Sequence, residues 1–496
     1  MLIWFLPVFL IFLIIGLPVI FGLLAAPGIL LWMSGQEKDI TLLYRNVYNG
    51  MDSFPLMAIP FFMLAGELMN KGGITTRLVE FSQALMGHLR GGLAHVNILS
   101  SMLFAGLSGS AVADTSALGS MLIPAMEKQG YTRRFAAAVT AASSVIGPII
   151  PPSGIMIIYA YVMGESVAAL FLAGIVPGIL VGVGLILVVR LMADRYDLPK
   201  AERIVRKGQP VSTREYWVSF ALLRLNLGWL FFAIFRGATG IGNSDTSALI
   251  PLVTYGVGVL TAHVLLMGLR NKVHPDFRTV SKRAVVPLQT PILILGGILL
   301  GVFTPTEAAA VAVLYAVIVA FFVLKTMTLS DLPKVLSRAA LTSSVVLLLV
   351  GAAMAFKTVV SLSYAPQILA EFILSLSENP LILLFLINIL LFVVGMFLDA
   401  GPAIIILGPI LGPIFVEMGV HPVHFAIIMS VNLTVGLATP PMGLVLFVAS
   451  SVAQEKVETI AKAILPFLAV EILVIFLITY VPAISMTIPR LTGFVN

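Results

Sequence analysis

The sequence predicts an all-α polytopic membrane protein with two inverted repeats, each containing a re-entrant helical hairpin and a broken helix. Composition is the first observation behind this fold class: 59% of the 496 residues are hydrophobic and 10% are charged, whereas soluble domains carry about 25% charged residues. The second is a series of apolar runs close to the ~20 residues that a helix needs to cross a bilayer. The third is a set of glycines and prolines that recur at a fixed offset.

Composition also limits the chemistry of the protein. The chain has no cysteine, which excludes disulfides, thiolate metal sites and cysteine nucleophiles. Its net charge of +6 fits the enrichment of Lys and Arg in the cytoplasmic loops of membrane proteins. No basic run alternates with aromatic residues, as a nucleic-acid surface requires. We therefore expect a lipid bilayer, and no nucleic acid, around this chain.

Eleven apolar runs are long enough to be membrane crossings. They span residues 2–33, 54–70, 135–163, 166–190, 216–235, 248–270, 284–303, 306–325, 337–358, 423–452 and 462–483. The first run has no basic start and no cleavage site, so we expect a retained membrane helix and not a signal peptide.

The connections between these runs predict the orientation of the chain. Five connections are basic, and all five lie on the cytoplasmic side when the N-terminus is cytoplasmic and the C-terminus is outside. They are 71–90, 127–134, 190–215, 270–283 and 325–338. The less basic connections then face outward; they are 36–52, 164–166, 304–306 and 359–380.

Two further apolar segments do not fit as simple crossings. Residues 92–126 are interrupted at Gly106–Ser110, each half has about 16 residues, and both flanks are basic. A hairpin that enters and leaves on the cytoplasmic side satisfies these facts. Residues 381–417, interrupted around Gly395–Pro402, form a second hairpin that enters from the outside.

An internal repeat relates these two regions. At an offset of 289 residues, eight glycines and prolines match without a gap, where composition predicts about one match or fewer. The pairs are Gly106 and Gly395, Gly119 and Gly408, Pro124 and Pro413, Gly130 and Gly419, Gly147 and Gly436, Pro151 and Pro440, Pro152 and Pro441, and Gly154 and Gly443. Because an odd number of crossings separates the hairpins, the two copies have opposite orientations.

Each repeat contains two helix breaks, one at its hairpin tip and one in its broken helix. The breaks are Ser108–Ser110, Gly147–Ser153, Phe397–Gly401 and Gly436–Pro441. Backbone groups released by a break cost several kcal/mol each in lipid unless something binds them. In secondary transporters such carbonyls coordinate Na⁺, and half-helix N-termini face anionic substrates. A single cluster of this kind is more simply a packing kink, but two symmetric pairs favour binding sites.

Four motifs in and near these repeats resemble a known family. They are GLSGSAVADTSALGSMLIPA at Gly106–Ala125, GPIIPPS at Gly147–Ser153, FTPTEAAA at Phe303–Ala310 and ATPPMG at Ala438–Gly443. They are similar to the large membrane subunit of tripartite ATP-independent periplasmic (TRAP) transporters, and the resemblance covers about residues 1–205 and 280–490. It implies an elevator-type, Na⁺-driven importer in the bacterial inner membrane, with a periplasmic C-terminus. The implied partners are a small four-helix membrane subunit and a periplasmic substrate-binding protein, and the implied substrates are carboxylates such as C4-dicarboxylates, sialic acids and 2-oxo acids.

The resemblance also implies site residues, including two or more Na⁺ sites. Its first Na⁺ site falls on Ser108, Ser110, Gly147, Ile150 and Pro152. By repeat symmetry the second lies near Phe397, Asp399, Gly436, Thr439 and Pro441. The expected substrate-binding residues are Ser110, Asp114, Ser153, Asp399 and Asn432. Two of these have structural alternatives: Asp114 as a partner of a helix N-terminus, and Asn432 as an interhelical hydrogen bonder.

An elevator transporter has a scaffold and a transport domain, and the chain divides accordingly. The expected parts are scaffold helices at 1–91, the first transport repeat at 92–163, a scaffold helix and loop at 164–208, an inserted helix pair at 209–276, scaffold and arm helices at 277–380, the second transport repeat at 381–452 and a C-terminal helix at 453–496.

Two other functions fit parts of the sequence. A stand-alone Na⁺/dicarboxylate symporter would have a similar plan of hairpins and repeats. The GLSG at Gly106–Gly109 also matches the GxSG of intramembrane serine proteases, with Ser108 as nucleophile and His263 as its base. The motif is short and lies inside an inverted repeat, so we expect a transporter and not an enzyme.

Overall fold

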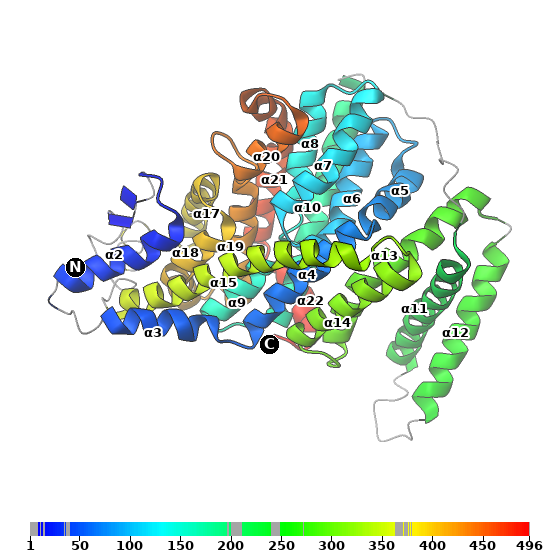
Figure 1. Ribbon diagram of the computed structural model, residues 1–496, viewed down its shortest axis with the longest axis horizontal. Coiled ribbons are helices and arrows are strands. Elements are labelled where there is room, and N and C mark those ends of the chain that lie inside the picture. Colours follow the sequence, from blue (N-terminus) through cyan, green and yellow to red (C-terminus); the bar gives the residue numbers. More distant parts are fainter. Residues whose placement is uncertain are drawn as a thin grey trace.

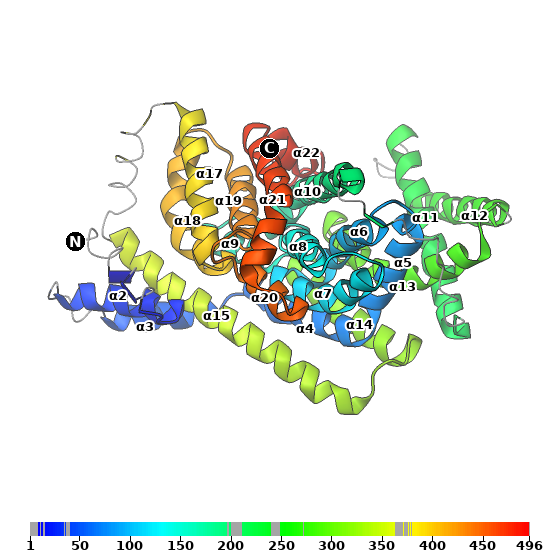
Figure 2. The same ribbon diagram turned by 90° about the horizontal axis from the view of Figure 1, so that it is seen from above.

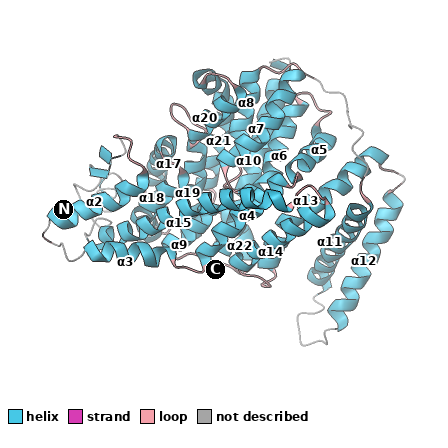
Figure 3. Ribbon diagram, in the orientation of Figure 1, coloured by secondary structure: helices cyan, strands magenta, loops and turns pink. Residues whose placement is uncertain are grey.

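The computed structural model confirms the all-α membrane fold class. It describes residues 8–9, 11–12, 15–33, 35, 40–195, 198–199, 211–239, 249–270, 272–362, 371, 375, 377 and 379–495. No strand occurs in these ranges, and helices make up nearly all of them (Figures 1 and 3). Within the described residues, nine helices are long and apolar enough to cross a membrane.

The helices up to the end of the first repeat are α2 (Val19–Met33), α3 (Ile40–Met51), α4 (Ala58–Lys71), α5 (Ile74–Met86), α6 (Gly92–Ser108), α7 (Ala111–Lys128), α8 (Arg133–Ser144), α9 (Gly154–Met163) and α10 (Val167–Arg195). The middle of the chain forms α11 (Thr213–Thr239), α12 (Leu249–Leu269), α13 (Pro275–Leu299), α14 (Pro305–Val317) and α15 (Leu332–Leu362). The second repeat and the C-terminus form α17 (Pro380–Phe397), α18 (Ala400–Glu417), α19 (Pro422–Gly436), α20 (Leu444–Ala453), α21 (Val457–Tyr480) and α22 (Ala483–Leu491). Short 3-10 turns at Pro55–Met57 and Leu329–Asp331 and a π-helix at Ile318–Val323 complete the described elements.

The repeat found in the sequence is present in the helices. The five helices α6–α10 have counterparts in α17–α21, and the equivalent helices begin 288 to 290 residues apart. Each copy therefore has a hairpin (α6–α7 or α17–α18), a broken helix (α8–α9 or α19–α20) and one long helix (α10 or α21). The predicted hairpins and broken helices are confirmed. Both breaks also contain a cis proline, at Pro152 and Pro441.

The two repeats interlock. The second arm of the first hairpin, α7, packs against α20, which is the second half of the other repeat's broken helix. In the same way α18 of the second hairpin packs against α9. The long helices α10 and α21 pack against each other. Each hairpin is thus held by both repeats, and together they form one bundle (Figure 2).

A second group of helices lies along one side of this bundle. The long helix α15 packs against α2, α3 and α4, and α14 packs against α4. Figure 2 shows α15 running along the outside of the bundle. This group contacts the repeats where α15 meets α18 and where α4 meets α6 and α9. In addition, Lys357 Nζ of α15 donates to the Val162 carbonyl oxygen of α9. The helix α10, which the sequence analysis assigns to the scaffold, packs against helices of both repeats.

The helix pair α11–α12 projects from the end of the molecule opposite to α2 and α3 (Figure 1). Its two helices correspond to the crossings predicted at 216–235 and 248–270. The pair joins the rest of the protein where α11 packs on α13, and large apolar side chains of α12 are exposed, among them Leu252 (66%) and Leu260 (64%). Exposed apolar surface of this kind is what a lipid-facing helix presents.

The structure differs from the sequence prediction in the short helices. Helix α5 occupies a segment predicted only as a basic connection, and it buries Ile74, Leu78 and Arg77, whose guanidinium pairs with Glu215 of α11. Helix α3 lies within the predicted outward connection 36–52 and is bent by 61° from the helices that follow it. Both helices have polar residues between their apolar positions. Their mean hydropathy is therefore too low for either to stand out as an apolar run in the sequence. Several basic residues of the 190–215 connection lie outside the described residues, as does most of 359–380.

Close glycine packing in the second repeat gives a stability prediction. A Cβ at Gly436 would lie 2.6 Å from the Cα and carbonyl carbon of Gly395, so the Gly436→Ala variant must push α17 away from α19. We expect a loss of stability of about 1–3 kcal/mol, as for other overpacked cores, measured as a lower apparent Tm of the purified protein. The control is Gly296→Ala, where a Cβ meets nothing within 4 Å. Equal melting temperatures of the two variants would contradict the packing shown here.

Candidate functional site

The tip of the first hairpin lies on the break of the first broken helix. Gly109 ends α6 in the left-handed conformation, with φ of +60°. A Cβ there would lie 2.6 Å from the Pro152 carbonyl oxygen. A Cβ on Gly106, one turn earlier, would be 2.9 Å from Cγ of Pro291 in α13. Glycine is therefore required at the tip both for the turn and for the close approach to the break.

Asp114 connects the same tip and break through its side chain. It is fully buried, and its Oδ1 accepts a hydrogen bond from the Ser108 hydroxyl. Its carboxylate also fills the space beside Gly147, where a Cβ would collide with Oδ2. Oδ2 has no hydrogen-bond partner among the described residues. A buried charged oxygen without a donor is costly, so this atom marks a place for a cation or a proton.

Gly147, which lies beside this carboxylate, begins a break in which several carbonyl oxygens have no hydrogen-bond partner among the described residues. The carbonyl oxygens of Gly147, Ile150 and Pro152 accept no hydrogen bond from the described part of the chain. The hydroxyls of Ser108 and Ser110 lie at the tip that packs on this break. The structure thus brings Ser108, Ser110, Gly147 and Pro152, four of the five residues of the predicted first Na⁺ site, to the contact between tip and break, and Ile150 lies within the same break. Such oxygens are the ligands that broken transporter helices offer to Na⁺, so the residues fit this ion.

The second repeat has the same arrangement of hairpin and break, but fewer of its predicted site residues have carbonyl oxygens without a hydrogen-bond donor. Its hairpin meets its break where Gly395 packs on Gly436. The Gly436 carbonyl oxygen accepts from the Thr439 amide at 2.9 Å, and the Thr439 carbonyl oxygen accepts from the Gly443 amide at 3.0 Å. Phe397 is 59% exposed, and Asp399 and Pro441 are also exposed, whereas Thr439 is buried. The predicted second site therefore has a weaker structural basis than the first.

Polar side chains cap three of the four half-helices that start at these breaks. Ser110 accepts from the Ala113 amide at the start of α7, and Ser153 accepts from the Met156 amide at the start of α9. Asp399 accepts from the Ala400 amide at 2.8 Å at the start of α18. Helix α20 starts after Gly443, which offers no side chain. The N-terminal ends of these half-helices carry partial positive charge and lie at the hairpin tips and helix breaks.

Asn432 belongs to a buried polar network between helices. Its Nδ2 donates to Oδ1 of Asn388 in α17 at 2.6 Å and to the Ile428 carbonyl oxygen at 2.8 Å. Thr479 of α21 donates to the same Asn388 oxygen at 3.1 Å. The equivalent position in the first repeat is Ser143, which donates to Asn97 of α6 at 3.3 Å. In both repeats this position links the broken helix to the first arm of its own hairpin.

Two charged residues inside apolar helices are absent from the predicted site residues. Glu471 of α21 is fully buried, and neither carboxylate oxygen has a hydrogen-bond partner in the part of the chain described. Lys357 reaches from α15 to the C-terminal end of α9. Ionisable residues at membrane depth usually have a function, and a scan for lone charges within predicted crossings would have found both.

The residues of the protease alternative have other partners. Ser108 donates to Asp114, and Nδ1 of His263 accepts from Nε of Arg224 in α11 at 2.9 Å. Helix α12, which carries His263, lies at the outer edge of the molecule, away from the α6–α7 hairpin (Figure 1). The Ser108–His263 pair of the protease alternative is therefore not formed.

Comparison with known proteins agrees with this geometry. Residues 6–484 match the family model described as the DctM component of tripartite ATP-independent periplasmic transporters. The sialic acid TRAP transporter large permease protein SiaM of Vibrio cholerae is 34% identical over 96% of this chain and 95% of its own length. The isethionate TRAP transporter permease protein DctMQ of Oleidesulfovibrio alaskensis is 36% identical over 96% of this chain and 65% of its own length.

A solved structure has a related fold. The Alcanivorax borkumensis YdaH transporter is similar over 93% of this chain and 89% of its own, with a TM-score of 0.53 and 15% sequence identity. At that identity the similarity concerns the fold alone.

A double-mutant cycle tests the role of Asn432. Asn432→Leu leaves the buried Oδ1 of Asn388 with one donor fewer, so we expect a loss of about 1–3 kcal/mol. Adding Asn388→Leu removes the acceptor as well, and the double variant then loses less stability than the sum of the single variants. Unfolding of the purified protein by denaturant gives these values. Fully additive losses would contradict the bond between the two side chains.

Proposed function

The chain belongs to the DctM family of tripartite ATP-independent periplasmic transporters, and from this premise we propose that it imports an organic acid anion by Na⁺-coupled secondary transport. The anion is a carboxylate such as a C4-dicarboxylate, a sialic acid or a 2-oxo acid. A periplasmic substrate-binding protein delivers it, and a small four-helix membrane subunit completes the complex. The observation that carries the proposal is the set of uncommitted oxygens between the first hairpin and the first break.

Na⁺ would be held by the carbonyls of Gly147, Ile150 and Pro152 and by the hydroxyls of Ser108 and Ser110. The ion supplies a positive charge that neutralises the buried Asp114 carboxylate. The chain's own residues hold the hairpin tip on the break. Asp114 accepts a hydrogen bond from Ser108 and lies beside Gly147, and Gly109 allows the tip to approach Pro152 closely. Occupation of the site therefore favours the closed arrangement of hairpin and break. The second set, around Phe397, Asp399, Gly436, Thr439 and Pro441, is proposed by repeat symmetry.

The substrate anion would bind at the half-helix N-termini. Helices α7, α9 and α18 begin at the two hairpin tips and the first break, and their caps are Ser110, Ser153 and Asp399. Positive helix ends attract anions without a fixed cationic side chain. Asn432 lies near the second break and completes the proposed set. These groups would bind carboxylates in general, so the separate binding protein would select which acid is transported.

Two relatives support the proposed substrates and partners. One is named for sialic acid, a carboxylate, and the other for isethionate, a sulfonate, so both names support an organic acid anion as the substrate class. The isethionate protein has about a third of its length outside the match with this chain. That length is enough for a small membrane subunit joined to the large one, as the name DctMQ suggests.

The arrangement of the helices supports an elevator mechanism. The interlocked repeats form one bundle, while α2, α3, α4, α14 and α15 lie along its side and have fewer contacts with it. The bundle would move as a unit against these helices and carry the bound anion across the membrane. Na⁺ drives this movement only because it binds the loaded state more tightly than the empty one.

Transport by reconstituted protein tests the proposal. The protein is placed in proteoliposomes with its small membrane subunit, an inward Na⁺ gradient and a panel of radiolabelled organic acids, with or without the binding protein. We expect uptake that needs both Na⁺ and the binding protein and falls at least tenfold in Ser110→Ala and in Asp399→Ala. Asp276→Ala, in the first turn of α13, is the control and keeps full uptake. Uptake with Na⁺ alone would indicate a stand-alone symporter, and no uptake of any acid would contradict the proposal.

Binding of Na⁺ itself is measured without transport. A ligand that binds the folded state raises the apparent Tm with its concentration, so we expect Na⁺, but not K⁺ at the same ionic strength, to raise the Tm of the wild-type protein. Asp114→Asn loses the negative charge beside Gly147, and the Na⁺-dependent rise should fall by more than half. Asp276→Asn keeps the full rise. An undiminished rise in Asp114→Asn would contradict the proposed site.

A further inference from the structure

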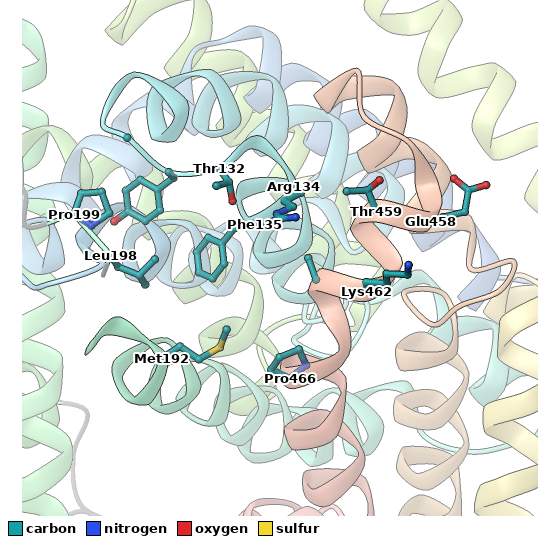
Figure 4. A pocket seen from close by; sticks show the side chains of 13 residues that line it. Thr132, Arg134, Phe135, Met192, Leu198, Pro199, Glu458, Thr459, Lys462 and Pro466 are labelled. Carbon is teal, nitrogen blue, oxygen red and sulfur yellow. The ribbon is translucent and has the colours of Figure 1, made fainter. Parts of the chain in front are cut away.

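A cavity of about 500 Å³ lies away from the hairpin tips. Its walls come from the connection between α7 and α8 with the first turn of α8, from the end of α10 with Leu198 and Pro199, and from the first three turns of α21. Three segments distant in sequence thus meet at one end of the bundle (Figure 4). Neither the proposed Na⁺ sites nor the proposed substrate residues line this cavity.

One side of the cavity is cationic. Arg134 of α8 and Lys462 of α21 both line it and lie near each other in Figure 4, together with Thr459. Neither cation has an ion pair or a hydrogen bond within the described residues. By contrast the neighbouring Arg133 is paired with Glu127 at 2.7 Å. The cavity also contains one carboxylate, Glu458, so its net charge is +1.

Two helix N-termini add positive potential at the same place. Helix α8 begins at Arg133 and α21 begins at Val457, and neither has a side-chain cap. The first backbone N–H groups of such helices are donors for an anion.

The opposite side of the cavity is apolar. Met192 and Leu198 line it and lie away from the cations in Figure 4, and Pro466 adds an apolar surface one turn after Lys462 on α21. The neighbouring residues on the same helices point outward: Leu191 is 70% exposed and Leu465 is 56% exposed. In a membrane protein such apolar faces contact acyl chains. The cavity therefore lies where the lipid-facing surface of α10 and α21 meets the water-facing ends of the helices.

We propose that this cavity binds an anionic phospholipid of the cytoplasmic leaflet. The phosphate lies between Arg134, Lys462 and the two helix N-termini, and the glycerol and the upper acyl chains lie on Met192, Leu198 and Pro466. The connections that form the cavity, 127–134 and 190–215, are two of the basic ones, and the positive-inside rule predicts the cytoplasmic side for them. Basic pockets between transmembrane helices on that side are typical sites for anionic lipid headgroups. A free phosphate or carboxylate would use the cations and leave the apolar side uncovered.

The test measures lipid retention by the purified full-length protein. Native mass spectrometry counts the lipids that stay bound after incubation with phosphatidylglycerol or with phosphatidylcholine of the same acyl chains. We expect one phosphatidylglycerol to be retained in preference to phosphatidylcholine. Because each basic residue near a membrane surface contributes roughly fivefold to the affinity for anionic lipid, Arg134→Gln with Lys462→Gln should weaken retention by about thirtyfold. Glu458→Gln removes the opposing charge and should strengthen it.

Matched controls separate this site from general charge effects. Lys334→Gln with Arg338→Gln removes two exposed cations from another basic segment and should leave retention unchanged. Ala463→Trp fills the cavity without changing charge and should abolish retention, which keeps the test valid if the double glutamine variant does not fold. Equal retention of the two lipids, equal losses in both double variants, or displacement of the lipid by millimolar inorganic phosphate or succinate would overturn the proposal.

Discussion

The structure depends on one constraint: backbone N–H and C=O groups inside a bilayer must have partners. Continuous helices satisfy this rule by themselves, and each repeat violates it twice, at a hairpin tip and at a helix break. Ser110, Ser153 and Asp399 satisfy the amides at three of the resulting N-termini. In the described part of the chain, the carbonyls of Gly147, Ile150 and Pro152 in the first break have no donor, and that of Pro152 lies against the first hairpin tip. The unsatisfied groups are thus concentrated where the proposed ion would bind.

Small residues allow the hairpins to reach these breaks. Gly109 approaches the Pro152 carbonyl, and Gly395 packs directly on Gly436. A side chain at any of these positions would separate the tip from the break and leave both sets of backbone groups exposed to lipid. This explains why glycine and proline carry the sequence repeat: they are the residues that set the backbone geometry, while the apolar positions between them can vary as long as they remain apolar.

Much of this architecture could be predicted from the sequence, because apolar length and glycine periodicity are properties of the chain itself. The hairpins, the broken helices and the α11–α12 pair all followed from them. The short helices α3 and α5 could not be found in this way, since their apolar residues face one side only. The contact of Asp114 with Gly147 joins residues on different helices, and the uncommitted state of the Gly147 carbonyl depends on the same tertiary fold. The sequence therefore predicts a set of residues for the first Na⁺ site but could not show which of their oxygens have no partner.

The difference between the two proposed ion sites has the same origin, namely which backbone carbonyls already accept hydrogen bonds. In the second break the carbonyls of Gly436 and Thr439 already accept hydrogen bonds from the following turn, so an ion there gains less by binding than at the first break. Equivalent helices can thus offer an ion unequal sets of free oxygens, although they begin within one residue of the same offset. The first hairpin also packs on α4 and α13, outside the repeats. An ion that orders the first tip therefore acts where the interlocked repeats meet the helices against which they would have to move.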